Sequence, residues 1–180
     1  MIILGIDPGT INTGFGIIRY KNFEMAKIFS GVIKLPAAQN IPFRLNIIYS
    51  EIDKLCRKYK PDEFAIETAF YGKNVQSAMK IGYARGVSVL AAVHNNLEVN
   101  EYSPREVKKA VVGKGAATKE QVQYMVQKIL NLNSEKIKFD ETDALAVAIC
   151  HAFAANSFVK TKTTSWKNFV ENNKHLIIGE

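Results

Sequence analysis

Four acidic residues stand at the ends of predicted strands and helices, where their types and spacing suit catalysis. Asp7 closes an apolar run rich in isoleucine and is followed at once by a turn-forming Pro-Gly pair. Glu67 closes a second, shorter apolar run. Asp140 and Asp143 open an apolar helix, and their spacing places them on one face of its first turn. An acid at a strand end beside a glycine turn is a common means of holding a metal ion or a phosphate.

The elements that carry these acids are predicted to meet. The strands at residues 2–7 and 63–67 are expected to be neighbours, because the chain of an α/β sheet changes direction between such units. Ligands bind outside the carboxyl ends of such strands. The helix from Asp140 to about Asn156 is apolar on nearly every side over residues 144–155, so it must be buried against the sheet. The sequence therefore predicts that all four carboxylates converge.

Carboxylates brought together in this way repel one another, and a hard divalent cation relieves the repulsion. Ligation by oxygen alone suits magnesium or manganese. Two such ions form the usual clamp for phosphodiester hydrolysis, in which one activates a water molecule and the other stabilises the leaving oxygen. The acids therefore favour a metal-dependent phosphodiesterase.

Each acid alone also has a purely structural explanation. Asp7 can cap the turn that follows it, Glu67 can be an ordinary strand-end residue, and Asp140 can be an N-cap. Asp143 is favoured in a first helical turn by the helix dipole. The residues alone leave both interpretations open, although the convergence of all four favours a metal site.

The remaining chain predicts an α/β fold. A strand at residues 13–20 and a third strand within 23–35, broken near Ser30-Gly31, follow the first with short connections and predict an antiparallel meander. A fifth strand is predicted at residues 97–102. Helices are predicted at residues 42–59 and 75–94, from Ser103 to Gly113 and from Thr118 to about Leu130, the last two opened by capping boxes.

Composition limits the class of protein. The chain has 180 residues, of which 47% are hydrophobic, enough for the core of a single domain. The formal net charge of +7 favours a polyanionic partner. The two cysteines, Cys56 and Cys150, lie far apart, which indicates a reducing compartment and excludes a structural zinc knot. Neither a signal peptide nor a membrane span is recognisable, so we expect a cytoplasmic protein.

Basic residues gather around two predicted helix ends and a glycine loop. They are Lys108, Lys109, Lys114 and Lys119. Lys119 stands in the first turn of its helix, where the helix dipole disfavours a cation and a bound phosphate would offset the penalty. The pattern predicts contacts with a nucleic-acid backbone, and the alternative is a solvated basic face.

The predicted loop after Glu67 carries a large aromatic residue. Phe70 lies three residues beyond the acid, and Lys73 and Asn74 follow in the same loop. Loops run over the protein surface, so such a ring is either folded back or presented to a partner. A ring next to the acids can stack on an unpaired nucleic-acid base, and Lys73 suits a phosphate.

Taken together, these motifs resemble the RuvC family of Holliday junction resolvases, over the chain up to about residue 156. The matching segments are Gly5-Ile6-Asp7-Pro8-Gly9-Thr10 with Thr13-Gly14, Ala65-Ile66-Glu67 with Phe70, Lys73-Asn74, Ala84-Arg85-Gly86, Val111-Val112-Gly113 and Asp140-Glu141-Thr142-Asp143-Ala144-Leu145-Ala146. The combination is specific, whereas Asp-Pro-Gly-Thr alone is not. The resemblance implies an RNase H-like domain at residues 1–156, with a mixed five-stranded sheet flanked by helices, and leaves residues 157–180 as a basic C-terminal extension of unknown role.

The same resemblance implies a function. Members of the family are homodimeric, magnesium-dependent endonucleases that make paired symmetrical nicks in four-way DNA junctions, in recombination and repair. The catalytic, metal-binding acids of the family fall on Asp7, Glu67, Asp140 and Asp143, although some members have histidine at the last position. Two magnesium ions, replaceable by manganese, are implied at each site. Basic positions important in the family match Lys108 and Lys119, an aromatic matches Phe70, and the branch-migration proteins RuvA and RuvB are implied as partners.

Two other functions remain as alternatives. Actin-like ATPases also begin a strand with Asp-x-Gly-Thr, but they need a second related domain to clamp the nucleotide, and 180 residues are too few for one. A non-catalytic junction-binding protein is the other alternative. It would gain nothing from clustered carboxylates facing phosphates, so the acids argue against it.

Overall fold

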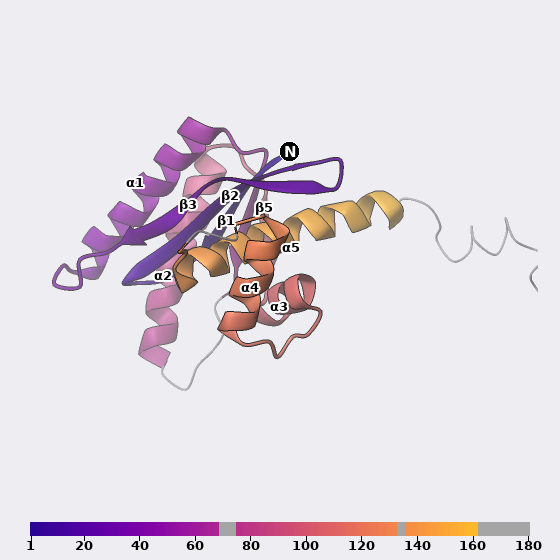
Figure 1. Ribbon diagram of the computed structural model, residues 1–180. Helices are drawn as coiled ribbons and strands as arrows, with labels where there is room; N and C mark the ends of the chain where they lie inside the picture. Colours follow the sequence, from indigo (N-terminus) through magenta and orange to yellow (C-terminus); the bar gives the residue numbers. More distant parts are fainter. Residues whose placement is uncertain (69–74, 133–135, 162–180) are drawn as a thin grey trace, which may run out of the picture.

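One mixed sheet forms the centre of the molecule (Figure 1). The computed structural model describes residues 1–68, 75–132 and 136–161, with the backbone alone for 156–161. The strands are β1 (Ile2–Asp7), β2 (Asn12–Lys21), β3 (Glu24–Lys34), β4 (Glu63–Glu67) and β5 (Val99–Tyr102). Their order across the sheet is β3-β2-β1-β4-β5. β1, β2 and β3 are antiparallel, whereas β4 runs parallel to β1 and to β5, which confirms the predicted meander and the predicted β1–β4 pair.

Helices cover both faces of this sheet (Figure 1). They are α1 (Ile41–Tyr59), α2 (Val75–His94), α3 (Pro104–Val112), α4 (Lys119–Ile129) and α5 (Phe139–Thr161). α5 lies across β1, β2 and β4 on one face, and α3 and α4 pack against it, whereas α1 and α2 cover the other face. The mixed five-stranded α/β architecture expected from the resemblance is confirmed. Of the helices in the described part of the chain, none is long and apolar enough to cross a membrane.

Three predicted boundaries differ from the structure. β3 is continuous through Ser30-Gly31; the irregularity lies where the β2 register shifts between Ile17 and Ile18. Gly31 does not break the strand but makes room for Phe15, because a Cβ there would lie 2.9 Å from the ring. β5 starts two residues later than predicted, at Val99. α5 continues to Thr161, past its expected end near Asn156, because no glycine or proline intervenes.

Glycines on β1 and β2 let α5 approach the sheet at backbone distance. A Cβ added to Gly5 would lie 2.3 Å from the carbonyl oxygen of Ala144, and one added to Gly14 would lie 1.9 Å from that of Asp140. Gly16, which pairs with Gly5 across the two strands, faces the Leu145 side chain in the same way. Any larger side chain at these positions would push α5 off the sheet, so glycine is required by close approach rather than by backbone conformation.

The turn between β1 and β2 is tied by a buried threonine. The Thr13 hydroxyl donates to the carbonyl of Gly9 at 2.8 Å, and the Gly9 N–H donates back to that hydroxyl at 3.3 Å. Thr13 is fully buried, so this pair satisfies polar groups that water cannot reach. The turn that follows Asp7 is therefore held in one shape.

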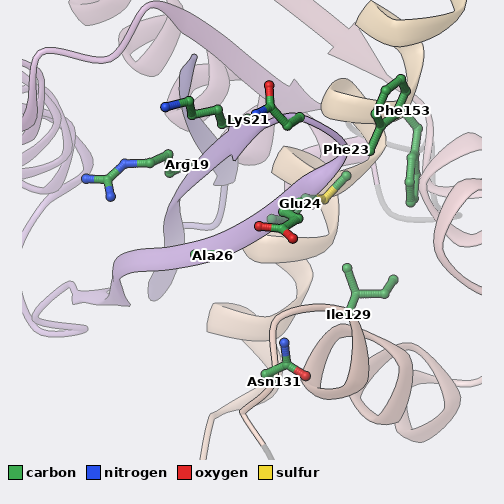
Figure 2. A pocket seen from close by; sticks show the side chains of 10 residues that line it. Arg19, Lys21, Phe23, Glu24, Ala26, Ile129, Asn131 and Phe153 are labelled. Atoms are coloured by element: carbon green, nitrogen blue, oxygen red, sulfur yellow. The ribbon is translucent and has the colours of Figure 1, made fainter.

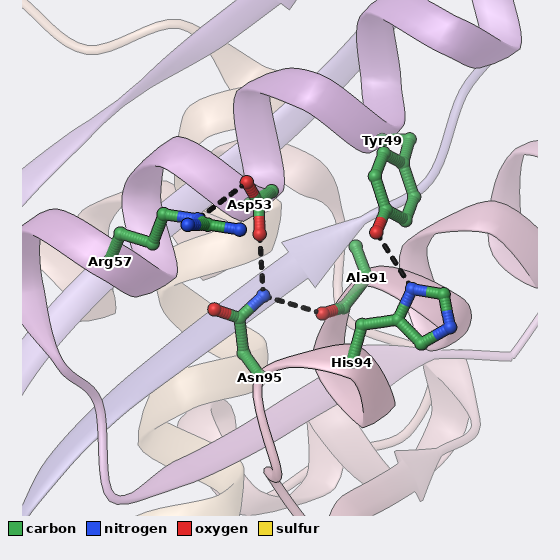
Figure 3. A network of polar contacts seen from close by, with 6 residues as sticks. All are labelled: Tyr49, Asp53, Arg57, Ala91, His94 and Asn95. Carbon is green, nitrogen blue, oxygen red and sulfur yellow. Dashed lines mark hydrogen bonds and ion pairs between the residues drawn. The ribbon is translucent and has the colours of Figure 1, made fainter.

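The C-terminal end of α2 is fixed to α1 by side-chain hydrogen bonds (Figure 3). Asn95 donates to Asp53 and to the Ala91 carbonyl, both at 2.9 Å. The Tyr49 hydroxyl lies 2.7 Å from Nδ1 of His94. This network orients α2 on the face of the sheet opposite α5.

The glycine contacts predict a large loss of stability for Gly5→Ala. The added methyl group must displace the backbone of α5, and overpacking of this kind costs typically about 1–3 kcal/mol. Urea denaturation followed by circular dichroism measures the change. The control is Gly82→Ala, an exposed position of α2 where a Cβ meets nothing within 4 Å. That variant should gain up to about 1 kcal/mol from helix propensity. A Gly5→Ala protein as stable as wild type would contradict the close approach.

Candidate active site

Asp7 and Glu67 lie side by side at one edge of the sheet. Both end parallel neighbours, and the pairing of Ile6 with Ile66 places the two acids level with each other. Side chains alternate between the faces of a strand. Gly5 faces α5 and Ile6 belongs to the core under α1 and α2, so Asp7 faces α5. Glu67 faces α5 by the same alternation.

The first turn of α5 brings the other two acids to this point. The backbone of Asp140 lies directly over Gly14, the residue that pairs with Asp7 across β1 and β2. The negative charges of Asp143 and Asp140 both raise the pKa of Asp7, and that of Asp143 also raises the pKa of Glu67. The four predicted acids therefore lie close enough in the structure for their charges to affect one another. Asp140 and Asp143 are half-buried, as are the two strand-end acids.

Crowding and burial shift the protonation of the two strand-end acids. Burial, followed by the charge of Asp143, raises the pKa of Asp7 from 3.8 to about 7. Burial, followed by the charge of Asp7, raises the pKa of Glu67 from 4.5 to about 8. Acids that are reluctant to ionise at neutral pH are typical of catalytic and metal-binding sites, because a cation or a reacting group completes them.

Two polar side chains hold the acids of α5. Nζ of Lys119 donates to Oδ2 of Asp143 at 2.8 Å, and this contact raises the pKa of Lys119. Nδ2 of Asn12 donates to Oδ2 of Asp140 at 3.0 Å. The ammonium group predicted to bind a phosphate thus lies on a carboxylate and partly neutralises the site. The side chain of Lys119 is 59% exposed, so it keeps access to solvent and to a ligand.

The other predicted nucleic-acid contacts divide into two groups. Lys108 of α3 is half-buried, and its charge lowers the pKa of Glu67, so it borders the acids. Lys114 is exposed in the loop between α3 and α4. Phe70, Lys73 and Asn74 fall within 69–74, outside the described residues.

Two residues that support the site escaped the sequence analysis. Asn12 directly precedes the Thr-Gly pair at the start of β2, and its position opposite the acid-bearing helix was its only signal. The Ser30 hydroxyl donates to Oε1 of Glu141 at 2.6 Å, which ties the first turn of α5 to β3. Ser30 was interpreted as part of a strand break, so its role had no signal in the sequence.

The donor set suits a hard cation. It consists of carboxylate oxygens, and the raised pKa values of Asp7 and Glu67 express an excess of negative charge that a divalent ion would relieve. In this conformation Lys119 and Asn12 engage the acids of α5. Consistently, within the described ranges no three Asp, Glu, His or Cys side chains converge tightly enough to bind one ion together. Binding of one ion by three or more of these acids would therefore require a rearrangement of side chains.

A pocket of about 880 Å³ lies away from these acids (Figure 2). It is bordered by the β2–β3 hairpin and by the ends of α4 and α5, with Arg19, Phe23, Ile129 and Phe153 among its lining residues. None of the predicted site residues in the described part of the chain lines it. Because Arg19 pairs with Ile2 and Gly14 pairs with Asp7, this pocket is at the opposite end of β1 from the acids. The large volume of this pocket therefore does not mark the place where the reaction occurs.

Comparisons with known proteins show the family of the chain. The family described as "Crossover junction endodeoxyribonuclease RuvC" matches residues 3–151. A relative of that name from Chloroherpeton thalassium is 43% identical, with 99% of this chain and 100% of the relative covered. One from Clostridioides difficile is 48% identical over 89% of this chain and 95% of its own length.

Solved structures agree as well. Thermus thermophilus RuvC in complex with a Holliday junction substrate superposes with a TM-score of 0.83 at 31% identity, covering 88% of this chain and 96% of that one. A second structure of Thermus thermophilus RuvC gives a TM-score of 0.80 at 30% identity, covering 88% of this chain and 97% of that one. These matches support the nuclease hypothesis over an actin-like ATPase or a non-catalytic binder. The chain belongs to the RuvC family of crossover junction endodeoxyribonucleases.

Proposed function

We propose that this protein resolves four-way (Holliday) DNA junctions by paired symmetrical nicks. Its family makes it a crossover junction endodeoxyribonuclease. The proposal adds that Asp7, Glu67, Asp140 and Asp143 bind two magnesium ions, for which manganese can substitute. When bound, such ions supply Lewis acids that activate water and stabilise the leaving oxygen.

The observation that carries this proposal is the convergence of the acids beside basic side chains. Burial and the charges of Asp143 and Asp140 raise the pKa of Asp7, and burial and the charges of Asp7 and Asp143 raise that of Glu67, which supports a close grouping of the carboxylates. Lys108 and Lys119 border the same acids from α3 and α4. A phosphodiester needs both features, because the acids hold the metal and the lysines contact the DNA phosphates.

Lys119 has two partners in this proposal. In the structure its ammonium binds Asp143. If Asp143 held a cation, Lys119 would be free at the N-terminus of α4, where a DNA phosphate would be a favourable partner for it. Lys114, exposed in the neighbouring loop, extends the basic surface along the DNA, and the loop that holds Phe70, Lys73 and Asn74 is proposed to contact the junction crossover.

We further propose that the enzyme is a homodimer, because paired nicks at symmetric positions need two sites related by a two-fold axis. α2 supports this with a stripe of exposed apolar side chains. Met79, Tyr83, Leu90 and Val93 are 46–53% exposed. Gly86 lies within the stripe, and a Cβ there would meet nothing within 4 Å. Val87, on the same helix, is not part of this stripe, because it is partly buried and packs into the core under α1 and α2.

RuvA and RuvB are proposed as partners on the family resemblance alone. We also propose that the protein works in the cytoplasm. Cys56 and Cys150 are both free and buried, which agrees with a reducing compartment.

Removing a carboxylate should separate cleavage from binding. Asp7→Asn, Glu67→Gln and Asp140→Asn should each slow nicking of a labelled four-way junction by at least about 100-fold, because even indirect partners of a metal contribute 10–100-fold. Junction affinity in a gel shift should change little, since phosphate contacts supply it. Asp53→Asn on α1, remote from the site, is the matched control, and a linear duplex is the control substrate. Near wild-type nicking by Asp7→Asn would refute the metal-site assignment.

Asp7→Asn and Glu67→Gln should also stabilise the metal-free protein at high pH. In the fold the pKa values of Asp7 and Glu67 are about 7 and about 8, whereas their ordinary values are 3.8 and 4.5. The folded state therefore binds more protons between these limits, and the free energy of unfolding falls as pH rises through them. With chelator at pH 8, Asp7→Asn should melt above wild type, and the difference should vanish near pH 4. Magnesium should raise the melting temperature of wild type more than that of the variant.

That stability prediction would be contradicted if Asp7→Asn melted below wild type at pH 8. It would also be contradicted if the melting temperatures of the two proteins changed with pH in the same way, since ionisation of the Asp7 carboxylate would then cost no stability.

The dimer proposal predicts that Leu90→Asp yields monomers. A charge buried in an apolar interface without a partner is strongly unfavourable. Light scattering should report about twice 20.1 kDa for wild type and about 20.1 kDa for the variant. Tyr124→Asp makes the same kind of change at an exposed residue of α4 and should remain dimeric. A wild-type protein that stays monomeric even with a junction bound would exclude the homodimer.

A further inference from the structure

Two exposed phenylalanines border the pocket between the β2–β3 hairpin and the ends of α4 and α5 (Figure 2). Phe23, at the tip of the hairpin, is 75% exposed, and Phe153 of α5 is 40% exposed. Met25 and Ile129 line the same pocket of about 880 Å³ and pack against the core around α5. Apolar side chains from three elements thus meet at one opening, and an exposed surface of this kind is typical of an interaction site.

The backbone at Phe23 has a conformation that a bulky side chain rarely adopts. Lys21 pairs with Glu24, so Asn22 and Phe23 form a two-residue hairpin loop. Both residues have positive φ, 53° for Asn22 and 67° for Phe23, as a type I′ turn requires. Glycine is the usual second residue of such a turn, and an aromatic residue there is an outlier. Because glycine would form this turn with less strain, the outlier points to a use for the ring.

The segment that follows α5 can reach this pocket. α5 lines the pocket through Phe153 and ends eight residues later, at Thr161. At a helical rise of about 1.5 Å per residue, that distance is about 12 Å. Residues 162–180 lie outside the described residues, and their sequence includes Trp166, five residues beyond Thr161. Five residues of extended chain span up to about 17 Å, which is enough to bring the tryptophan back to the level of Phe153.

The lining of the pocket suits an indole ring. Phe23 and Phe153 offer aromatic surfaces against which the ring can pack. A buried indole N–H needs an acceptor, and the side chains of Glu24 and Asn131 in the same lining carry oxygens that can accept it. Arg19 adds a guanidinium, which binds favourably over the face of an indole. This mixture of aromatic, acceptor and cationic groups matches tryptophan better than a purely aliphatic side chain.

We propose that residues 162–180 of this chain fold back along α5 and insert Trp166 between Phe23 and Phe153. The segment would cover the exposed apolar side chains and join the tip of the hairpin to α5. The proposal goes beyond the nuclease function and does not depend on it, because the pocket lies at the opposite end of β1 from the acids.

The fluorescence of Trp166 tests the proposal directly, because it is the only tryptophan in the chain. In the full-length protein without DNA, its emission should lie at shorter wavelength than in urea, and acrylamide should quench it weakly. Phe23→Gly removes the ring and suits the turn. It should lower the ratio of docked to undocked segments by about tenfold, the effect expected for the loss of one buried aromatic contact. The emission should then shift to longer wavelength, and quenching should increase.

Melting temperatures provide a second readout through a double-mutant cycle. Trp166→Ala should lower the melting temperature of the wild-type protein. The same substitution should have much less effect in the Phe23→Gly background, since the two side chains act through one contact. The matched control is Phe43→Ala, which removes a ring that is 48% exposed on α1, across the sheet from α5. It should change neither the emission of Trp166 nor the effect of Trp166→Ala.

Four results would overturn the proposal. Wild-type emission and quenching equal to those of the unfolded chain would show that Trp166 is not docked. A Trp166 that stays protected in Phe23→Gly would lie elsewhere on the protein. Protection that is lost on dilution would mean that the segment of a second copy fills the pocket. Protection that arises only after a four-way junction is added would make docking a property of the DNA complex. Because none of these readouts is cleavage, failure here leaves the proposed function untouched.

Discussion

The close packing of α5 on the sheet is the constraint on which the rest of this structure depends. At Gly5 and Gly14 no side chain separates the strands from the backbone of α5, and Gly16 makes room for the Leu145 side chain. This contact fixes the height and the direction of α5 together. Because Asp140 lies over Gly14 and Gly14 pairs with Asp7, the same contact that builds the core also sets the separation of the acids. The same helix–sheet contact therefore determines both the packing of the core and the geometry of the site.

The site that results from this packing is electrostatically unfavourable, because it places carboxylates close together in a partly buried position. Burial and mutual repulsion hold the pKa values of Asp7 and Glu67 at about 7 and about 8. Lys119 offsets part of the repulsion by its ion pair with Asp143. Its side chain is nevertheless more than half exposed, and it lies in the first turn of α4, where the helix dipole disfavours a positive charge. A cation at the acids and a phosphate at the helix end would each remove one of these penalties. The fold of the metal-free protein therefore already favours binding of a cation and a phosphate.

The sequence was most informative where chemistry and chain geometry coincide. Asp7 and Glu67 end apolar runs, and an apolar run that ends on an acid specifies both a strand and its functional edge. Asn12 and Tyr102 gave no such signal, because their partners lie on α5, far along the chain. The break predicted at Ser30-Gly31 failed for a related reason: Gly31 accommodates the ring of Phe15, a contact that local propensity does not contain. Contacts between distant segments are what single-residue patterns miss.

His151 shows why burial alone cannot classify a polar residue. It lies on the apolar helix α5 and is only 5% exposed. The burial does not make it inert, because its two ring nitrogens face Tyr102 at the end of β5 and Glu63 at the start of β4. An apolar residue of similar size would fill the space without fixing a direction. A hydrogen-bonded ring fixes one, so the helix that carries Asp140 and Asp143 is also tied to the end of β5 through Tyr102.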